Sequence, residues 1–258
     1  MKTASYDEVM GTIKLGIQDK RLIAVIGDPG SGKSSLLDDV EHSYQNAHRI
    51  LCSPTMTLKD LMLKIASCMQ IHVKGDKNKV QDLLTEALIQ EPNHILLFDE
   101  GEYLHGHGAE KIDVLRQIHD ESNTPMILCG TFKLKSLLTD ADKNHNQPQI
   151  TRRLFKAEFK PVTKDEFTSY IDELEKLLVI RFKSEARNEL FSLCTDAENG
   201  GLGIFIFYLE NTLPFIRPEW KDICEAQKLN KPYDTSQLEN ITVDKALLKQ
   251  TSRFLMTR

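Results

Sequence analysis

Long apolar runs, paired cysteines and a strong excess of one charge are all missing from this sequence. No apolar stretch approaches the length needed to cross a membrane. Residues 1–18 carry Asp7 and Glu8 among mixed polar residues, which is not the pattern of a secretory signal peptide. The five cysteines are scattered, odd in number and contain no C-x-x-C pair, so a disulfide framework is not expected. These absences predict a reduced, cytoplasmic protein with no membrane partner.

The net charge of −5 neither indicates nor excludes a nucleic-acid partner, because local patches matter more than the sum. Among the basic patches in the sequence is a cluster in which Lys74, Lys77 and Lys79 lie close together around Gly75. A solvated surface is the ordinary interpretation of a lysine cluster. The cluster therefore becomes a candidate DNA contact only if other features of the chain indicate DNA.

Strand-like runs alternate with segments of helical periodicity through the first two-thirds of the chain. Short apolar runs predict buried strands at 22–26, 49–52, 94–98 and 126–129. Alternation of this kind predicts an α/β fold, in which a parallel sheet is covered by helices on both faces. Ligands of such folds bind at the carboxyl ends of the strands. A polar segment at 140–149 predicts an exposed loop, and a short strand at 158–160 is expected to close the sheet.

The C-terminal part of the sequence predicts a smaller helical domain. From Thr163 the periodicity becomes helical, and Thr163 with Glu166 has the pattern of a capping box. Further helices are expected near 184–194, 203–212 and 243–255, with an irregular excursion at 214–240. We therefore expect an α/β domain at 1–161 and a helical domain at 162–258.

The most specific pattern in the chain is a G-x-x-x-x-G-K-S sequence, the phosphate-binding or Walker A loop of nucleotide hydrolases. An apolar strand precedes it and a helix can follow it, which is the context that the motif requires. The glycines let backbone N–H groups turn toward phosphates, and the helix N-terminus adds partial positive charge. A glycine-rich turn of another kind is the plain alternative. The predicted ATP contacts are Gly27, Asp28, Pro29, Gly30, Ser31, Gly32, Lys33, Ser34 and Ser35.

Roles within this loop follow from side-chain chemistry. Lys33 can reach the β- and γ-phosphates, and the Ser34 hydroxyl can ligate Mg²⁺. The strand at 94–98 then ends in Asp99-Glu100, which matches the second nucleotide motif. Asp99 would hold Mg²⁺, usually through water, and Glu100 would polarise the attacking water. A helix-capping pair of acids is the alternative for these two residues.

Three further residues are weaker candidates. Thr131 follows the strand at 126–129, where a polar side chain can touch the lytic water or the γ-phosphate, although an ordinary turn residue fits as well. Arg152 and Arg153 precede the last expected strand. In ring-forming ATPases an arginine at this place reaches the nucleotide of a neighbouring subunit and neutralises charge on the γ-phosphate. A plain surface role is equally compatible with their spacing.

With these elements in order, the chain resembles AAA+ ATPases, and it is most similar to the transposition-regulator branch of the MuB, TniB and TnsC proteins. The order and separations fit from about Leu22 to Leu213. The stretches that carry the resemblance are 24–34, 96–104, 127–131 with Leu134, and Arg152-Arg153-Leu154-Phe155.

The resemblance implies a function and a set of roles. In that family ATP binding drives assembly of a ring or helical filament on duplex DNA, which marks a target and recruits a DDE-type transposase, and hydrolysis disassembles it. It implies catalytic roles for Lys33 and Glu100, Thr131 in the sensor position, and Arg153, more than Arg152, as the trans-acting arginine. It also implies that Lys74, Lys77 and Lys79 contact the DNA backbone.

The sequence also departs from that family. Gly203 stands where many relatives carry a nucleotide-contacting arginine after a glycine pair, so hydrolysis is expected either to be slow or to depend more on Arg152 and Arg153. Two other functions remain open: a helicase loader of the DnaC type, and a signalling or defence switch that binds ATP but hardly hydrolyses it. His105 and His107 invite a zinc site, but two histidines in a glycine-rich loop without a nearby cysteine are more often surface residues.

Overall fold

The computed structural model describes residues 3–104, 110–144, 154–196, 201–229, 231 and 233–253. The chain divides into two compact units, one from residues 2–28 and 32–160 and the other from residues 161–258 together with 29–31. Within the described residues, no helix is long and apolar enough to cross a membrane.

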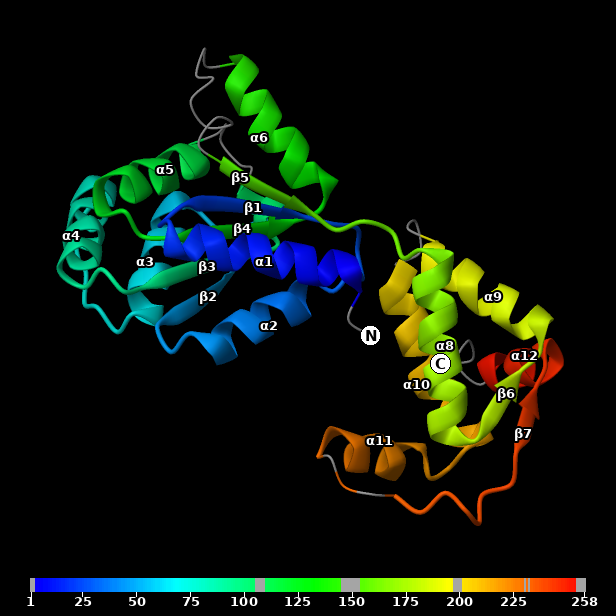
Figure 1. Ribbon diagram of the computed structural model, residues 1–258. Coiled ribbons are helices and arrows are strands. Elements are labelled where there is room, and N and C mark those ends of the chain that lie inside the picture. Colours follow the sequence, from blue (N-terminus) through cyan, green and yellow to red (C-terminus); the bar gives the residue numbers. More distant parts are fainter. Residues whose placement is uncertain are drawn as a thin grey trace. The chain divides into compact units, whose positions relative to one another are not determined.

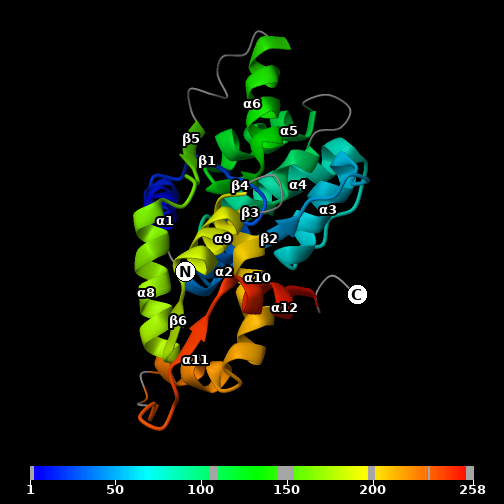
Figure 2. The ribbon, with the colours of Figure 1, turned by 90° about the vertical axis from the view of Figure 1, so that its right-hand side faces the viewer.

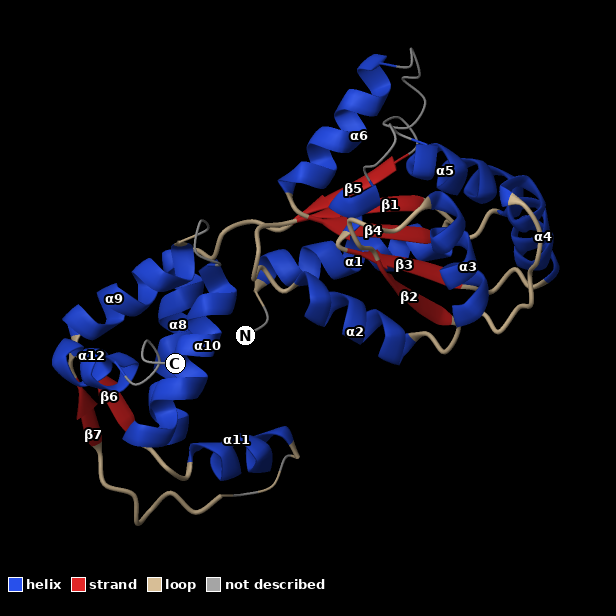
Figure 3. Cartoon of the chain, turned by 180° about the vertical axis from the view of Figure 1, so that it is seen from behind, coloured by secondary structure: helices blue, strands red, loops and turns tan. Residues whose placement is uncertain are grey.

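The first unit is built on a five-stranded parallel sheet with the strand order β2-β3-β4-β1-β5 (Figures 1 and 3). The predicted α/β class is therefore confirmed. Its strands are β1 Leu22–Ile26, β2 Ala47–Leu51, β3 Ile95–Asp99, β4 Met126–Gly130 and β5 Leu154–Glu158. Its helices are α1 Ala4–Gln18, α2 Lys33–Ser43, α3 Leu58–Cys68, α4 Lys77–Gln90, η1 Gly101–Leu104, α5 Glu110–Ser122 and α6 Phe132–Asn144.

The central strands are apolar without interruption because helices cover both faces of the sheet. In β1, Ile23 and Val25 pack on the face that α1 and α2 cover. Leu22, Ala24 and Ile26 pack on the opposite face, with residues of α3, α4 and α5. Successive side chains of a strand point to opposite faces, so a strand covered on both sides needs an apolar residue at every position. All five residues of β1, β3 and β4 are buried.

Helix α1 precedes the first strand and was not expected from the polar N-terminal sequence. The Thr3 side chain accepts a hydrogen bond from the Tyr6 N–H at 3.1 Å and caps the helix. The Tyr6 hydroxyl donates to Asp39 of α2 at 2.5 Å. Burial and the nearby carboxylates of Asp39 and Asp7 raise the pKa of Tyr6. The helix therefore belongs to the layer that covers one face of the sheet.

The second unit is mainly helical and has a core of its own. Thr163 and Glu166 form the predicted capping box at the start of its first helix. A two-stranded parallel sheet of β6 and β7 completes the unit (Figure 2). Its elements are α8 Lys164–Leu178, β6 Ile180–Phe182, α9 Ser184–Thr195, α10 Gly201–Ile216, α11 Trp220–Lys228, β7 Ile241–Val243 and α12 Lys245–Arg253.

Three expectations about local structure were wrong. The predicted strand at 158–160 lies four residues earlier, as β5, where only Leu154 and Ala157 are buried and the apolar pattern is weak. In the predicted loop at 140–149, residues 140–144 are helical, because polarity alone does not separate an exposed helix from a loop, and residues 145–149 lie outside the described part of the chain. The predicted excursion at 214–240 contains the end of α10, which continues past Pro214, and the whole of α11.

Candidate nucleotide-binding site

The loop after β1 has the backbone conformation that the G-x-x-x-x-G-K-S motif predicts. Gly30 and Gly32 adopt φ angles of 77° and 99°. A Cβ added to Gly32 would meet no atom within 4 Å, so conformation and not crowding requires glycine there. Helix α2 begins at the next residue, and the first N–H groups of a helix have no partner within it. Loop and helix end together form an anion-binding backbone.

The Lys33 ammonium is folded onto this loop. It donates hydrogen bonds to the carbonyl oxygens of Gly27 and Asp28 at 2.9 and 2.7 Å. Burial lowers the pKa of Lys33, while nearby groups, among them Glu102 and Asp99, act in the opposite direction. A partly desolvated cation whose hydrogen bonds within the described residues go to neutral carbonyl oxygens is suited to exchange them for phosphate oxygens, since hydrogen bonds between charged partners are stronger.

The hydroxyl groups of the loop fit a phosphate ligand. The Ser31 hydroxyl is buried and, among the described residues, has no hydrogen-bond partner. Such a group needs a partner to offset its desolvation, and a bound phosphate oxygen would supply one. Ser34 and Ser35 are exposed in the first turn of α2, where Ser34 could ligate a metal ion. The residues of this loop therefore fit a nucleoside triphosphate with Mg²⁺.

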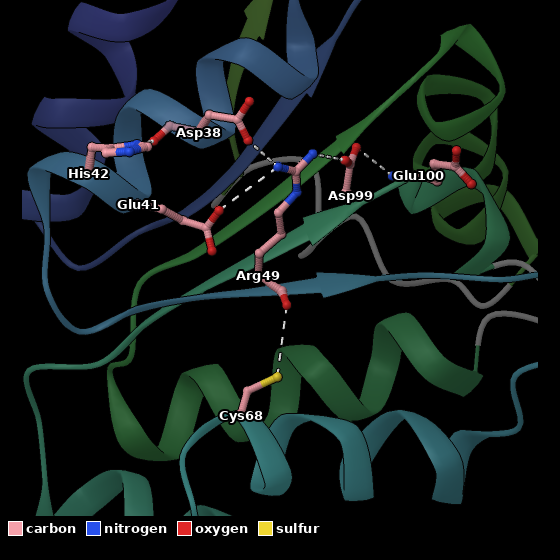
Figure 4. A network of polar contacts seen from close by, with 7 residues as sticks. All are labelled: Asp38, Glu41, His42, Arg49, Cys68, Asp99 and Glu100. Carbon is pink, nitrogen blue, oxygen red and sulfur yellow. Dashed lines mark hydrogen bonds and ion pairs between the residues drawn. The ribbon is translucent and has the colours of Figure 1, made fainter.

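Asp99 ends β3 as a buried carboxylate, with 7% of its side chain exposed. Its Oδ1 accepts a hydrogen bond from the Glu100 N–H at 2.9 Å. Its Oδ2 accepts one from Arg49 Nη2 at 2.5 Å. Arg49 projects from the neighbouring strand β2, and its other terminal nitrogen contacts Asp38 of α2 (Figure 4). Asp99 therefore already has a cationic partner within the protein.

Arg49 was missed by the sequence reasoning. The sequence predicts only a strand at 49–52, and a charged residue at the start of this otherwise apolar stretch is the one signal that could indicate Arg49. Burial lowers the pKa of Arg49, but the carboxylates of Asp99 and Asp38 more than offset this and raise it overall. The guanidinium is therefore a permanent positive charge beside the acid that is expected to hold the metal.

Glu100 joins this network through its backbone N–H, but its side chain lies apart from it. Its side chain is exposed and points away from Arg49 and Asp99 in Figure 4. Its φ angle of 54° is left-handed, which is an unfavourable conformation for a residue with a side chain. Strained residues of this kind cluster at functional sites. The conformation turns Glu100 out of the sheet immediately after the buried Asp99.

Thr131 has a carboxylate partner that the sequence reasoning also missed. Its hydroxyl donates to Glu102 Oε1 at 3.1 Å, and its N–H donates to Oε2 at 3.3 Å. Glu102 lies in η1, directly after the Asp99-Glu100 pair. A Cβ on Gly130 would lie 2.6 Å from Glu102 Oε2, so glycine at the end of β4 permits this approach. The carboxyl ends of β3 and β4 are joined in this way.

The lysine cluster lies at the start of α4. Lys74, Lys77 and Lys79 are all exposed. Lys77 is paired with Glu110 of α5, which neutralises part of the cluster's positive charge. Asp76 caps α4 by accepting a hydrogen bond from the Lys79 N–H at 3.0 Å. The cluster is thus a surface feature with a smaller net charge than the sequence suggests.

Several predicted residues lie outside the described part of the chain. These are Arg152 and Arg153, the candidate trans-acting arginines, and His105 and His107, the candidate zinc ligands. Gly203 is described and lies in the first turn of α10. Within the described ranges, no group of three or more histidine, cysteine, aspartate or glutamate side chains could hold a metal ion by itself.

The part of the chain that carries this site is similar in sequence to a known family. The family model of the AAA domain matches residues 16–138, which include the loop, Asp99, Glu100 and Thr131. No curated protein matches the sequence.

Solved structures share the fold at low sequence identity. Cdc6p from Pyrobaculum aerophilum is similar with a TM-score of 0.60 and 14% identity, over 87% of this chain and 62% of that one. A Walker-type ATPase of Pyrococcus abyssi gives a TM-score of 0.62 and 18% identity, over 87% and 72%. The RuvB Holliday junction branch migration motor of Thermotoga maritima gives 0.54 and 15%, over 96% and 69%. The chain thus spans less than two-thirds of the Cdc6p chain.

Proposed function

We propose that the protein binds ATP with Mg²⁺ and hydrolyses it, starting from the match of residues 16–138 to the family model of the AAA domain. The observation that carries the proposal is the convergence of three neighbouring strands. The carboxyl ends of β1, β4 and β3 lead into the glycine loop, Thr131, and Asp99 with Glu100, respectively. Ligands of parallel α/β sheets bind at this edge.

Each residue then has a distinct role in the proposed reaction. Loop N–H groups and Lys33 bind the phosphates, and Ser34 and Asp99 hold Mg²⁺, which supplies charge neutralisation at the phosphates when bound. Glu100 orients the attacking water as general base. Thr131 senses the γ-phosphate, with its hydroxyl oriented by Glu102. Arg152 or Arg153 contributes positive charge to the site of a neighbouring copy.

The finer proposal is that ATP-bound copies assemble on duplex DNA and select a target for a DDE-type transposase. The sequence resemblance to transposition regulators supports it, and so does the exposure of Lys74, Lys77 and Lys79. The likeness to a branch migration motor agrees with a DNA-associated role. Backbone contacts by lysine carry no sequence information, so this binding would be independent of base sequence and sensitive to salt.

A second candidate is a signalling or defence switch that binds ATP but hardly hydrolyses it. The position of Glu100 favours it, because the side chain points into solvent and away from Asp99 (Figure 4). Thr131 also favours it, because its hydroxyl and N–H donate to Glu102 and so already have a partner other than a γ-phosphate. Both candidates share the ATP site and differ in the rate of hydrolysis.

Calorimetry and turnover assays test the ATP site. Lys33→Ala should weaken Mg²⁺–ATP binding roughly 10- to 100-fold, because it removes a charge-assisted hydrogen bond to phosphate. Lys133→Ala, at an exposed position of α6, is the control and should bind as the wild type does. Wild-type protein that gives a flat calorimetric trace with ATP in magnesium buffer would overturn the proposal.

Substitution of the two acids Glu100 and Glu102 tests whether Glu100 acts as the base in ATP hydrolysis, as the ATPase proposal requires and the switch does not. Glu100→Gln should reduce turnover by at least about 100-fold and leave ATP binding intact, since it removes only the general base. Glu102→Gln keeps a group that can accept from Thr131 and should reduce turnover less. If Glu100→Gln leaves the rate unchanged, Glu100 is not the base.

Electron microscopy with ATP and duplex DNA tests the finer proposal, and monomers under every condition would contradict it.

A further inference from the structure

The Arg49 guanidinium bridges the expected metal-binding acid and the helix that follows the phosphate loop. Nη2 is bonded to Asp99 Oδ2 at 2.5 Å. Nη1 contacts Asp38 and lies 3.9 Å from Glu41 Oε2, both on α2 (Figure 4). Asp38 is four residues after Ser34, so the two lie on the same side of α2, one turn apart. The network thus joins β2, β3 and α2 beside the nucleotide site.

Asp99 needs a cation in this environment. A carboxylate at the buried end of a strand is costly without charge compensation. Arg49 provides it, and both Asp99 oxygens already accept a hydrogen bond in the structure, one from Arg49 and one from the Glu100 N–H. A metal ion that uses Asp99, directly or through water, must approach a carboxylate that Arg49 already holds through Oδ2.

Arg49 cannot give up its charge to make room. A guanidinium stays protonated in proteins, so repulsion between Arg49 and a divalent cation can be relieved only by movement. The structure contains a place for it to go. Asp38 already contacts Arg49, and Glu41, at 3.9 Å, lies just beyond hydrogen-bond distance. The side chains of Asp38 and Glu41 are 55% and 35% exposed, so this pair lies on the solvent side of Asp99.

We propose that Arg49 is an internal competitor of Mg²⁺ for Asp99, and that metal–nucleotide binding shifts Arg49 from Asp99 onto the α2 carboxylates Asp38 and Glu41. The exchange sets the Mg²⁺ concentration at which the site loads, and it couples the occupancy of Asp99 to α2. This inference rests on the proposed ATP site and adds a regulatory residue to it.

The test is a Mg²⁺ titration of fluorescently labelled ATP binding to the full chain. Arg49→Met should lower the half-saturating Mg²⁺ concentration about tenfold, because it removes a cation that competes with the metal for the Asp99 carboxylate. Asp38→Asn should raise it about threefold, because it weakens the alternative site for Arg49 at a largely exposed ion pair. Association of Mg²⁺ with free ATP is the same for every variant, so the differences report on the protein.

Arg187→Met is the matched control. Arg187 in the second unit also bridges two carboxylates, Asp172 and Glu175, and 29% of its side chain is exposed, against 25% for Arg49. Its substitution should lower thermal stability and leave the Mg²⁺ midpoint unchanged. In EDTA, Arg49→Met should not bind labelled ATP more tightly than the wild type, because removing a cation cannot favour a polyanion.

A lowered Mg²⁺ midpoint in Arg49→Met together with a raised one in Asp38→Asn supports the exchange. An unchanged or raised midpoint in Arg49→Met overturns it, and a raised one would make Arg49 a residue that orients Asp99. Should Arg49→Met fail to fold, the exposed Asp38→Asn decides alone, and an unchanged or lowered midpoint there overturns the exchange. Binding by the wild type establishes the ATP site separately, so a failure of the variants to shift is distinct from a failure of the site.

Discussion

At the residue scale, the half-buried His48 and the buried His94 form a pair at the end of the sheet opposite the nucleotide site. His48 Nε2 lies 2.8 Å from His94 Nδ1, and His94 Nε2 lies 3.1 Å from Glu91 Oε2. Since one ring nitrogen must donate and the other accept, the two rings cannot both be protonated in this arrangement. Burial lowers the pKa of His48, His94 lowers it further, and a hydrogen bond to the Cys68 backbone opposes both.

This pair predicts a loss of stability in mild acid. Because the pKa of His48 is lower in the folded protein than its unfolded value of about 6.5, the unfolded chain takes up protons first as the pH falls. The stability that neutral His48 contributes is fully present above about pH 6.5 and is lost as the pH falls through the pKa of His48 in the folded protein. Urea unfolding at pH 7.5 and pH 5.5 should show a larger drop in unfolding free energy for the wild type than for His48→Phe.

An exposed histidine provides the control for this measurement. His72 follows α3 and is exposed, so His72→Asn should keep the pH dependence of the wild type. If His48→Phe loses as much stability between the two pH values as the wild type, other groups account for the change. Any difference between His48→Phe and His72→Asn isolates the pair from carboxylates that titrate at lower pH.

At the element scale, the capping box of α8 predicts a local contribution to stability. The Thr163 side chain accepts from the Glu166 N–H at 3.3 Å, and Glu166 accepts from the Thr163 N–H at 2.9 Å. Thr163→Ala should lower the unfolding free energy of the second unit by about 1 kcal/mol, because a helix N–H loses its acceptor. Urea unfolding followed by the fluorescence of Trp220, the only tryptophan, reports on this unit.

A second threonine of the same helix serves as the comparison. Thr168 lies one turn further along α8, where its hydroxyl donates to the Lys164 carbonyl at 2.7 Å. Alanine is the better helix former at such an interior position, so Thr168→Ala should be neutral or slightly stabilising. Equal losses from the two substitutions would show that capping is not the cause.

The elements that the sequence predicted well are those whose cause is local. The runs of β1, β3 and β4 are apolar at every position because both faces are buried, so their places were evident. Only two residues of the edge strand β5 are buried, and its start was predicted four residues too late. The paired strands β6 and β7 have three residues each and were missed, since their partners are about sixty residues apart in the sequence.

The residues of the candidate site also fall into those that local sequence predicts and those that it does not. Gly30, Gly32, Lys33 and the acids after β3 follow from short-range spacing, and the structure places them at the carboxyl edge of the sheet. Arg49 and Glu102 act across strands: Arg49 meets Asp99 only through the register of β2 with β3, and Glu102 meets Thr131 only where β3 and β4 end side by side. Pairing of this kind is set by tertiary structure.

At the scale of the whole molecule, the two units have separate hydrophobic cores. Side chains from both faces of the five-stranded sheet form the cores of the first unit. The core of the second unit contains buried residues of α8, β6, α9, α10, α11, β7 and α12. Units with their own cores can unfold separately, in which case a single unfolding temperature does not describe the chain.

Separate cores predict that Mg²⁺–ATP stabilises the two units unequally. Most of the proposed site lies in the first unit, so ligand at 100 times its Kd should add about 2.7 kcal/mol there, or about 5–10 °C in unfolding temperature for a unit of this size. Far-ultraviolet circular dichroism follows both units, whereas Trp220 fluorescence follows the second. The dichroism should gain a higher transition while the fluorescence transition moves less. At the same ATP concentration Lys33→Ala, which binds roughly 10- to 100-fold more weakly, should gain only about 0.4–1.4 kcal/mol. Coincident transitions that rise together would instead show that ligand makes the chain one cooperative unit.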